Sequence, residues 1–425
     1  MGVVLAGFDQ AAEDEASGAP GPLVLIEQHA HQGGGHHQHA LTALAATGTC
    51  LVVAPAGLSE ELGPLVRSGA QIAAGADGAA ARFLLAAARA AERISATGQR
   101  AFASRRWPRP VRRTPHQITL LARCLTEAAC LRTARRRAPR AAAVVILSAS
   151  EALHGLAALL GGVPHLRFVH ELVTAEDRPV RWLGRLARRG EKQVVALYPT
   201  AAVHDRITAA FPRLAGQVRA FAVDDGRRLT EAERDGGRTA FAIPDDATAV
   251  CVVGGWWPYK DIATIDAALA RLTTPLHVLV CGTPLDDAVL ARWHRLPHTH
   301  IHTVPGPVAD QILRLVYGAS DATLVARHPG VGKESGLVMD AARLGVPLLL
   351  SEHDPELTAR LAREAWVRSF PAGDADALAQ TLDKLSAEVP ARPAPSAPEV
   401  LDLHPAPDQA AFLTATYARL IKECR

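Results

Sequence analysis

Residues 322–350 read ATLVARHPGVGKESGLVMDAARLGVPLLL. The aliphatic run Ala322–Val325 predicts a buried strand, and a glycine-bearing loop separates it from an amphipathic helix over 334–344. Gly345 is suited to end that helix, and 347–350 predicts the next strand. A strand, a loop, a helix and a second strand in this order form the repeating unit of a parallel α/β sheet.

The same alternation of short aliphatic runs and helical patterns extends along most of the chain. A length of 425 residues suits two domains better than one. We therefore predict an α/β protein with two Rossmann-like domains, whose parallel sheets face each other across a cleft. The predicted strands are 23–26, 50–54, 143–147, 166–170 and 194–198 in the first series, and 249–254, 276–281, a strand around 301, 322–325 and 347–350 in the second.

Composition breaks suggest where these domains begin and end. The alternation of strand and helix patterns stops in the polar stretch 224–238 and resumes at Ala249. We therefore assign 1–220 to the first domain and 221–395 to the second. Residues 396–425 contain the end of a proline-rich linker and a predicted helix. That helix is long enough to cross back onto the first domain.

Charge and cysteine usage limit the kinds of partner that the chain suits. The net charge is only +3, which argues against nucleic acid. Twelve arginines but one acid, Glu127, lie between positions 100 and 140. A solvated helix face is the favoured interpretation of this region, ahead of a site for an anionic acceptor or a peripheral membrane contact. Six scattered cysteines and the absence of a basic, apolar N-terminal signal indicate a reduced cytoplasmic setting.

The loop at 327–333 has the character of a phosphate site. Arg327 and Lys333 supply positive charge, and the glycine-bearing turn opens into a helix N-terminus with unpaired N–H groups. A Walker A motif is excluded because Arg327 stands at its first glycine position and Glu334 at its last. Taken alone, the loop could also be an ordinary βα connection.

The run 335–347 resembles the donor-binding signature of GT-B glycosyltransferases of family 4, also called group 1. The resemblance implies that Asp340 holds the ribose hydroxyls of a nucleotide and that Glu334 meets the transferred sugar. Six residues separate these acids, whereas the family usually has eight, and Asp replaces the usual Glu. The resemblance also places the donor against a group of residues around the helix start, namely Gly332, Lys333, Ser335, Gly336 and Leu337.

A second match, VVGGWWPYKD at 252–261, resembles the strand, glycine turn and lysine of the same family. The resemblance implies that Gly255 lies close to the donor and that Lys260 is a catalytic residue binding the donor diphosphate. The arginine that usually accompanies this lysine is missing, and tryptophans stand near its place. Arg327 or Lys333 is then expected to replace it.

The first domain carries weaker signals. Gly34 and Gly35 belong to a glycine turn after the first strand, where GT-B enzymes approach donor phosphates or the acceptor. His170 ends a predicted strand, at the position where many family 4 enzymes place a histidine beside the sugar. The resemblance therefore makes His170 the catalytic candidate of the first domain. A histidine that only caps the strand end would explain this position nearly as well. Five histidines crowd 29–39, but no partner acid or cysteine has ligand-like spacing apart from Glu27, so we predict no metal.

The resemblance implies transfer of a hexosyl group from a nucleoside diphosphate sugar to a hydroxyl, with retention and without a cofactor. A secondary metabolite, an oligosaccharide or a lipid-linked molecule would suit the acceptor role. A sugar-nucleotide 2-epimerase of GT-B fold and a non-catalytic nucleotide-sugar-binding protein are the alternatives. A dehydrogenase is disfavoured because the first glycine loop lacks GxGxxG. The donor base, the donor sugar and the oligomeric state are left open.

Overall fold

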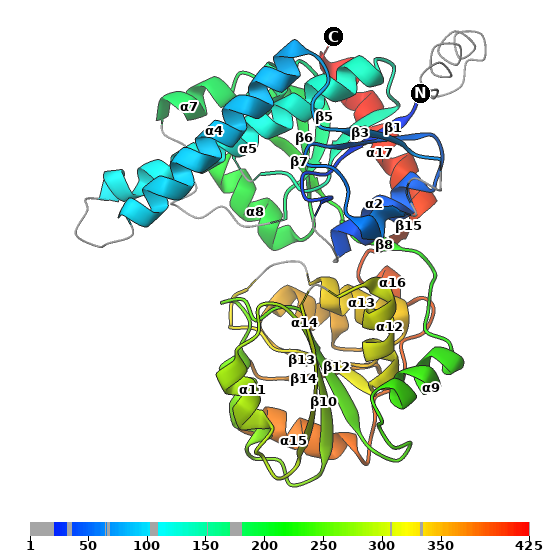
Figure 1. Ribbon diagram of the computed structural model, residues 1–425. Helices are drawn as coiled ribbons and strands as arrows, with labels where there is room; N and C mark the ends of the chain where they lie inside the picture. The colour runs from blue at the N-terminus through cyan, green and yellow to red at the C-terminus, as the bar shows by residue number, and fades with distance from the viewer. Residues whose placement is uncertain are drawn as a thin grey trace, which may run out of the picture.

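The protein consists of two α/β bodies joined by crossing segments near one edge, as the computed structural model in Figure 1 shows. The structure describes residues 21–31, 36–63, 65, 69–102, 109–150, 152–170, 181–306, 308–331 and 335–424. Gly34, Gly35, Gly332, Lys333 and Glu334 lie outside these ranges. What the sequence indicates for those five residues therefore stays a prediction.

The first domain is built on a seven-stranded parallel sheet in the order β3-β2-β1-β4-β5-β6-β7. Its central strands consist of fully buried aliphatic residues, as strands covered by helices on both faces require. The strands are β1 Leu23–Ile26, β2 Cys50–Ala54, β3 Gln71–Ala74, β4 Ala143–Ile146, β5 His165–Phe168, β6 Val194–Tyr198 and β7 Ala215–Val218.

In the described part of the first domain, these strands alternate with helices and short 3-10 turns. The α4–α5 pair forms a long antiparallel hairpin across the outside of the domain (Figure 1). The helices are α2 His36–Ala45, α4 Ala79–Phe102, α5 Arg109–Arg137, α6 His154–Gly161, α7 Arg181–Ala187 and α8 Ala201–Ala210, with turns η1 Glu60–Leu62 and η2 Glu191–Gln193. α5 begins before Pro115 and continues through the proline.

The second domain has a six-stranded parallel sheet in the order β11-β10-β9-β12-β13-β14. Its strands are β9 Ala249–Val253, β10 Leu276–Gly282, β11 Thr299–Pro305, β12 Ala322–Val325, β13 Leu348–Ser351 and β14 Val367–Phe370. Its helices are α9 Glu231–Ala240, α10 Ile262–Leu269, α11 Asp287–Trp293, α12 Asp310–Ala319, α13 Gly336–Leu344, α14 Pro355–Leu361, α15 Ala375–Leu385 and α16 Ala397–Val400.

The C-terminal helix α17, Ala406–Cys424, returns to the first domain as predicted. It packs against α2, β4 and β5, and its residues Leu413, Tyr417 and Leu420 belong to the first-domain core. Just before α17, the two-residue strand β15 His404–Pro405 pairs in parallel with β8 Val223–Asp224. Two chain segments therefore cross between the domains side by side.

Two further properties of the chain bear on the sequence predictions. The six cysteines, all among the described residues, form no disulfide, and five of them are buried. None of the helices within the described ranges has the length and apolar character needed to cross a lipid bilayer.

Candidate functional site

Two cationic side chains meet at the carboxyl edge of the second sheet. Lys260 follows β9 and Arg327 follows β12, and their backbones pair in an antiparallel bridge. β9 has β10 on one side and β12 on the other, so the strand order reverses between β9 and β12. Ligands of doubly wound α/β sheets bind in the crevice at such a switch point. The fold therefore presents both cations where this class of sheet holds its ligands.

Lys260 is held over the end of β9. Its Nζ donates hydrogen bonds to the carbonyl oxygens of Val253 at 2.6 Å and Gly254 at 2.9 Å. Together with Arg327 and Leu337, the first-turn residue of α13, Lys260 lines a cavity of about 10 Å³. Two carbonyl dipoles thus orient the ammonium group without neutralising it.

Burial and, to a lesser extent, the positive charge of Arg327 together lower the pKa of Lys260 to about 7. Burial also lowers the pKa of Arg327, whose side chain is only 4% exposed. The charge of Arg327 lowers the pKa of Lys260 because a neighbouring like charge disfavours the protonated form. An anion entering between them would relieve this repulsion, so the pair is electrostatically suited to phosphate groups.

Tyr259 and His328 connect the two loops that carry these cations. The guanidinium carbon of Arg327 lies 5.3 Å from the centre of the Tyr259 ring, within cation–π range. The backbone N–H of His328 donates to the Tyr259 carbonyl at 3.1 Å. Asp261 accepts the Thr264 N–H as the N-cap of α10, and His328 lies 3.7 Å from its carboxylate. The loop after β9 and the loop after β12 therefore form one unit.

Gly255 has a packing reason for being glycine. A Cβ on this residue would lie 2.0 Å from the carbonyl oxygen of Thr283, in the loop after β10. The adjacent Gly254 has φ +82°, in the region that favours glycine. The glycine turn predicted to lie near the donor thus allows the loops after β9 and β10 to touch.

The start of α13 points its free N–H groups toward the same edge of the sheet, because the helix follows the loop after β12. Ser335 is the N-cap residue, Gly336 and Leu337 begin the helix, and the Ser335 side chain accepts no capping hydrogen bond. Its buried hydroxyl has no hydrogen-bond partner among the described residues. A helix N-terminus with an unused hydroxyl is chemically suited to an anionic ligand.

Asp340 lies one turn further along α13 and already has partners. Its Oδ1 accepts a hydrogen bond from Arg343 at 2.9 Å, and its Oδ2 accepts one from the Tyr317 hydroxyl at 3.3 Å. The sequence did not predict these partners. Any ribose that Asp340 holds must share this carboxylate with Arg343.

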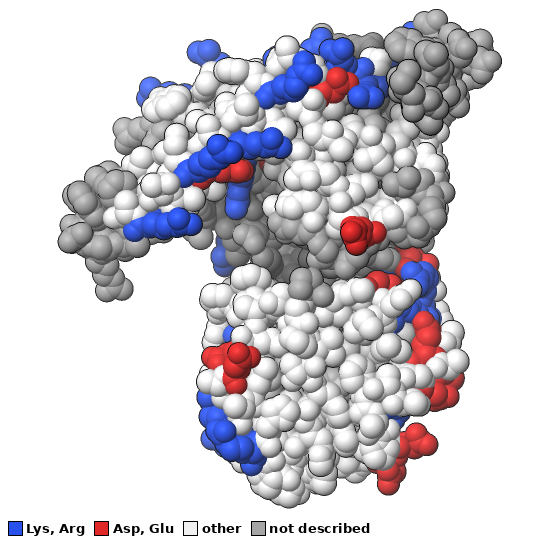
Figure 2. All heavy atoms as spheres, in the orientation of Figure 1, with Lys and Arg blue, Asp and Glu red and all other residues white. Residues whose placement is uncertain are grey.

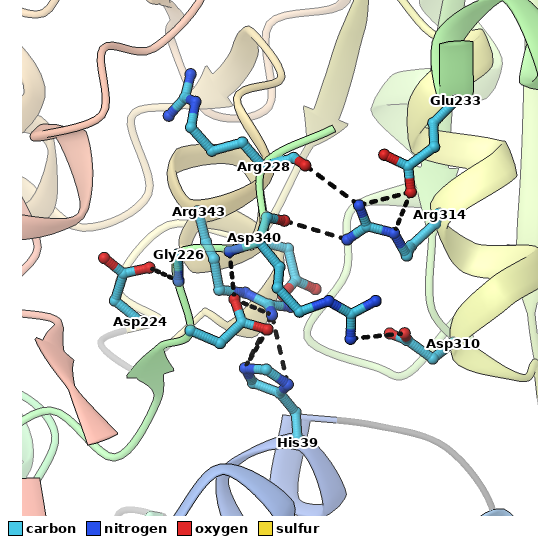
Figure 3. Close-up of polar contacts among 11 residues, drawn as sticks. His39, Asp224, Gly226, Arg228, Glu233, Asp310, Arg314, Asp340 and Arg343 are labelled. Carbon is cyan, nitrogen blue, oxygen red and sulfur yellow. Dashed lines mark hydrogen bonds and ion pairs between the residues drawn. The ribbon is translucent and has the colours of Figure 1, made fainter. Parts of the chain in front are cut away.

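Arg343 joins the two domains, as Figure 3 shows. Its guanidinium donates to His39 Nε2 at 2.8 Å and lies 3.3 Å from Asp225, which follows β8. His39 projects from α2 of the first domain, so it has a specific partner rather than belonging to a free histidine cluster (Figure 3). Burial and the charge of Arg343 lower the pKa of His39, while Asp225 and Asp340 oppose that shift.

His170 lies at the carboxyl edge of the first sheet, just after β5. One of its ring nitrogens, Nε2, lies 2.8 Å from the Leu147 carbonyl oxygen, and its ring meets Phe221 edge-on at 4.5 Å between centres. These contacts tie the ring to the first domain and to the start of the crossing segment. The described residues contain no cluster of three or more His, Cys, Asp or Glu side chains arranged for a metal ion.

Glu27 is a further candidate residue, at which the sequence only hinted. It directly follows β1, which lies next to β4 at the switch point of the first sheet, and it is 1% exposed. Its Oε2 accepts a hydrogen bond from Ser148 Oγ at 2.7 Å, and its Oε1 accepts one from the His29 N–H at 2.8 Å. A polar residue directly after a buried aliphatic run was the available signal.

His353 is a second candidate residue that was not predicted from the sequence. It follows β13, and its ring Nδ1 lies 3.0 Å from Ser351 Oγ, which accepts the Arg327 N–H. Burial and the nearby Arg327 lower the pKa of His353 to about 4. Its carbonyl accepts the Gly330 N–H at 2.8 Å. His353 thereby supports the loop that carries Arg327, and its place after a predicted strand was the only signal in the sequence.

Comparisons with known proteins identify the fold. No protein-family model and no curated protein sequence matches the chain. HepE from Anabaena in complex with UDP-glucose is similar in structure, with a TM-score of 0.58, 11% identity, and coverage of 95% of this chain and 99% of that one. WaaG, a glycosyltransferase involved in lipopolysaccharide biosynthesis, has a TM-score of 0.54, 12% identity, and coverage of 94% and 98%.

A third structure with the same architecture is the N-terminal domain of trehalose-6-phosphate phosphatase from Candida albicans. Its TM-score is 0.59, with 9% identity and coverage of 95% of this chain and 100% of that one. With two parallel sheets and a returning C-terminal helix, the chain has the GT-B fold, as predicted. At these identities the likeness concerns fold alone, so membership of family 4 stays a prediction.

Proposed function

We propose that this protein is a glycosyltransferase that moves a sugar from a nucleoside diphosphate sugar to an acceptor hydroxyl. The observation that carries the proposal is the pairing of Lys260 with Arg327 at the switch point of the second sheet. Arg327 pairs with the lysine although 67 positions separate them, so it would take the place of the arginine that the 252–261 motif lacks.

In the proposed reaction the bond between the anomeric carbon and the phosphate oxygen breaks, and the nucleoside diphosphate leaves with the bonding electrons. Lys260 and Arg327 stabilise the negative charge that develops on this leaving group. The N-terminus of α13 with Ser335, and Lys333 and Gly332 before it, would bind the same phosphates. The acceptor oxygen bonds to the anomeric carbon on the face that the phosphate leaves, which gives retention, and its proton passes to the leaving phosphate.

Asp340 would bind the ribose and Glu334 the sugar, as the resemblance implies. The position of Asp340 on α13 supports the first assignment, because α13 follows the loop that carries Arg327. The first domain would supply the acceptor side, with His170 at its carboxyl edge, and the glycine turn predicted at Gly34 and Gly35 would approach the donor phosphates or the acceptor. The structures of HepE in complex with UDP and with UDP-glucose support a nucleotide-sugar ligand for this fold.

A thermal-shift screen against nucleoside diphosphates tests the donor site first. We expect the nucleoside diphosphate of one base to raise the melting temperature of the protein more than the others do, since a ligand that binds the native state stabilises it. Lys260→Ala should remove that response, whereas the exposed Lys422 of α17 provides a matched control, Lys422→Ala, that should keep it. No response to any nucleoside diphosphate in the wild-type protein would contradict the proposal.

The same preparation then separates the proposed transferase from its alternatives. A transferase releases nucleoside diphosphate from the donor at an enhanced rate when an acceptor is added. A 2-epimerase changes the donor without any acceptor. A binding protein responds in the thermal-shift screen and leaves the donor intact.

A further inference from the structure

Helix α4 carries an ordered stripe of arginines on its exposed side. Arg82, Arg89, Arg93 and Arg100 are all exposed and are separated by 7, 4 and 7 residues. At 3.6 residues per turn, this spacing places all four within about 40° of one another around the helix and along about 27 Å of its length. Figure 2 shows basic side chains following this helix across the first domain.

A second stripe, which is apolar, runs beside the arginines. Phe83 and Ile94 are exposed to 73% and 60%, and Ala90 lies between them. These three residues lie roughly 100° around the helix from the arginines, on one flank only. Glu92, the single acid of α4, lies on the opposite flank. The helix therefore presents a basic face with an apolar border on the side away from its acid.

Within the part of the chain that the structure describes, neither stripe packs against the rest of the fold. α4 packs through Ala81, Leu85, Ala88 and Ser95 against α5, and α5 in turn packs on β1, β2, β4 and α6. Within the described residues, the guanidinium groups of the four arginines make no ion pair or hydrogen bond. By contrast, Arg136 and Arg137 of α5 are both paired with Asp77. Large exposed side chains without a structural partner indicate a surface that binds something else.

We propose that the exposed face of α4 docks this protein on an anionic lipid surface. Basic residues on one face attract phosphate head groups, and a neighbouring apolar strip inserts at the boundary with the acyl chains. A soluble polyanion such as nucleic acid would use the arginines but would gain little from Phe83 and Ile94. A solvated helix face would carry acids spaced among its arginines, whereas α4 has Glu92 alone, on its far flank. This inference does not depend on the proposed transferase activity.

Co-sedimentation of the full chain with phosphatidylcholine vesicles, with and without phosphatidylglycerol, tests the proposal. We expect binding only to vesicles that contain phosphatidylglycerol, and weaker binding as salt is raised. Removing two arginines in R89Q/R93Q should weaken vesicle binding roughly 20- to 30-fold, because each basic residue near such a surface contributes about a fivefold gain. The control R295Q/R363Q removes the same charge from exposed positions of the second domain and should bind as wild type.

The apolar stripe distinguishes a membrane from a soluble polyanion. F83S/I94S should weaken binding to phosphatidylglycerol vesicles while leaving the affinity for heparin unchanged. If F83S/I94S binds vesicles as wild type, the arginines serve a soluble polyanion and the lipid proposal is wrong. Equal binding by R89Q/R93Q and R295Q/R363Q, or no preference of the wild type for phosphatidylglycerol, would also overturn it.

Discussion

Arg343 of the second domain donates a hydrogen bond to Nε2 of His39 in the first domain, at 2.8 Å. The bond requires a neutral imidazole with a lone pair on Nε2. Asp225, 3.7 Å from that nitrogen, and Asp340 favour the protonated ring, as does the more distant Asp310, but burial and Arg343 prevail and lower the pKa of His39. The interdomain contact therefore depends on the charge state of one histidine.

We predict that this contact weakens on acidification. Because the pKa of His39 is lower in the folded protein than the ordinary value of 6.5, its contribution to stability is present above pH 6.5 and is lost as the pH falls below it. The contribution should be about 1 kcal/mol. His39→Gln keeps a hydrogen-bond acceptor that does not titrate, so urea unfolding at about pH 7.5 and about pH 5 should show a smaller difference in this variant than in wild type. Equal differences would contradict the role of His39.

Lys260 should make nucleotide affinity depend on pH near neutrality. Its pKa is lowered to about 7 by burial and Arg327, and a bound diphosphate favours its protonated form. Affinity for a nucleoside diphosphate should therefore fall as the pH rises through 7. In Lys260→Arg, the side chain stays charged and the dependence should flatten. Isothermal titration at several pH values measures this, and an unchanged slope in Lys260→Arg would exclude Lys260 as its source.

Removing the buried charge of Lys260 should not destabilise the fold. Lys260→Met keeps most of the side-chain volume and relieves the repulsion with Arg327, so its melting temperature should equal or exceed that of wild type while nucleotide affinity is lost. A scanning calorimetry trace without ligand gives the first quantity and a titration gives the second. A large drop in melting temperature would show that Lys260 serves the structure rather than a ligand.

The pair Glu127–Arg167 should be a major determinant of first-domain stability. Both side chains are 0% exposed, with Arg167 Nη2 at 3.0 Å from Glu127 Oε2, and Glu127 also accepts the Ser150 N–H. Glu127→Gln leaves a buried guanidinium without a counter-charge, which we expect to lower the free energy of unfolding by about 3 to 5 kcal/mol. Glu127→Leu combined with Arg167→Met should restore most of that loss in urea unfolding. A cost below about 1 kcal/mol for Glu127→Gln would show that solvent reaches the pair.

The sequence was sufficient to predict the fold where strands are buried on both faces. Ala249–Val253 and Cys50–Ala54 are uninterrupted apolar runs because helices cover both sides of each sheet. The edge strands Ala215–Val218 and Val367–Phe370 were not predicted, since their exposed positions carry small or polar residues such as Gly216 and Arg368. Edge strands have a weaker apolar signal for this physical reason.

The structure brings two of the predicted site residues together, and it adds contacts that the sequence did not predict. Arg327 was expected to replace a missing arginine, and its backbone does pair with Lys260. The partners of Asp340 could not be predicted, because Arg343 is held by a histidine 304 residues away. Local sequence patterns do not reveal contacts between residues so far apart in the chain. His353 is similar: its relation to Arg327 arises only when β13 lies beside β12.

Asp340 provides the sharpest test of the donor site. If its carboxylate holds the ribose, the wild-type protein should bind its preferred nucleoside diphosphate roughly tenfold more tightly than the 2′-deoxy form, because one hydrogen bond to a charged acceptor is lost. Asp340→Asn should weaken binding of the ribonucleotide and reduce that discrimination.

Tyr317→Phe is the matched control for this test, since it removes the 3.3 Å hydrogen bond to Asp340 but keeps the carboxylate and its ion pair with Arg343. It should retain the preference for ribose. Titration calorimetry of the three proteins with both nucleotides measures the coupling directly. Equal discrimination by Asp340→Asn and wild type would assign Asp340 to the contact with Arg343 alone, and the ribose would have to be bound by another residue.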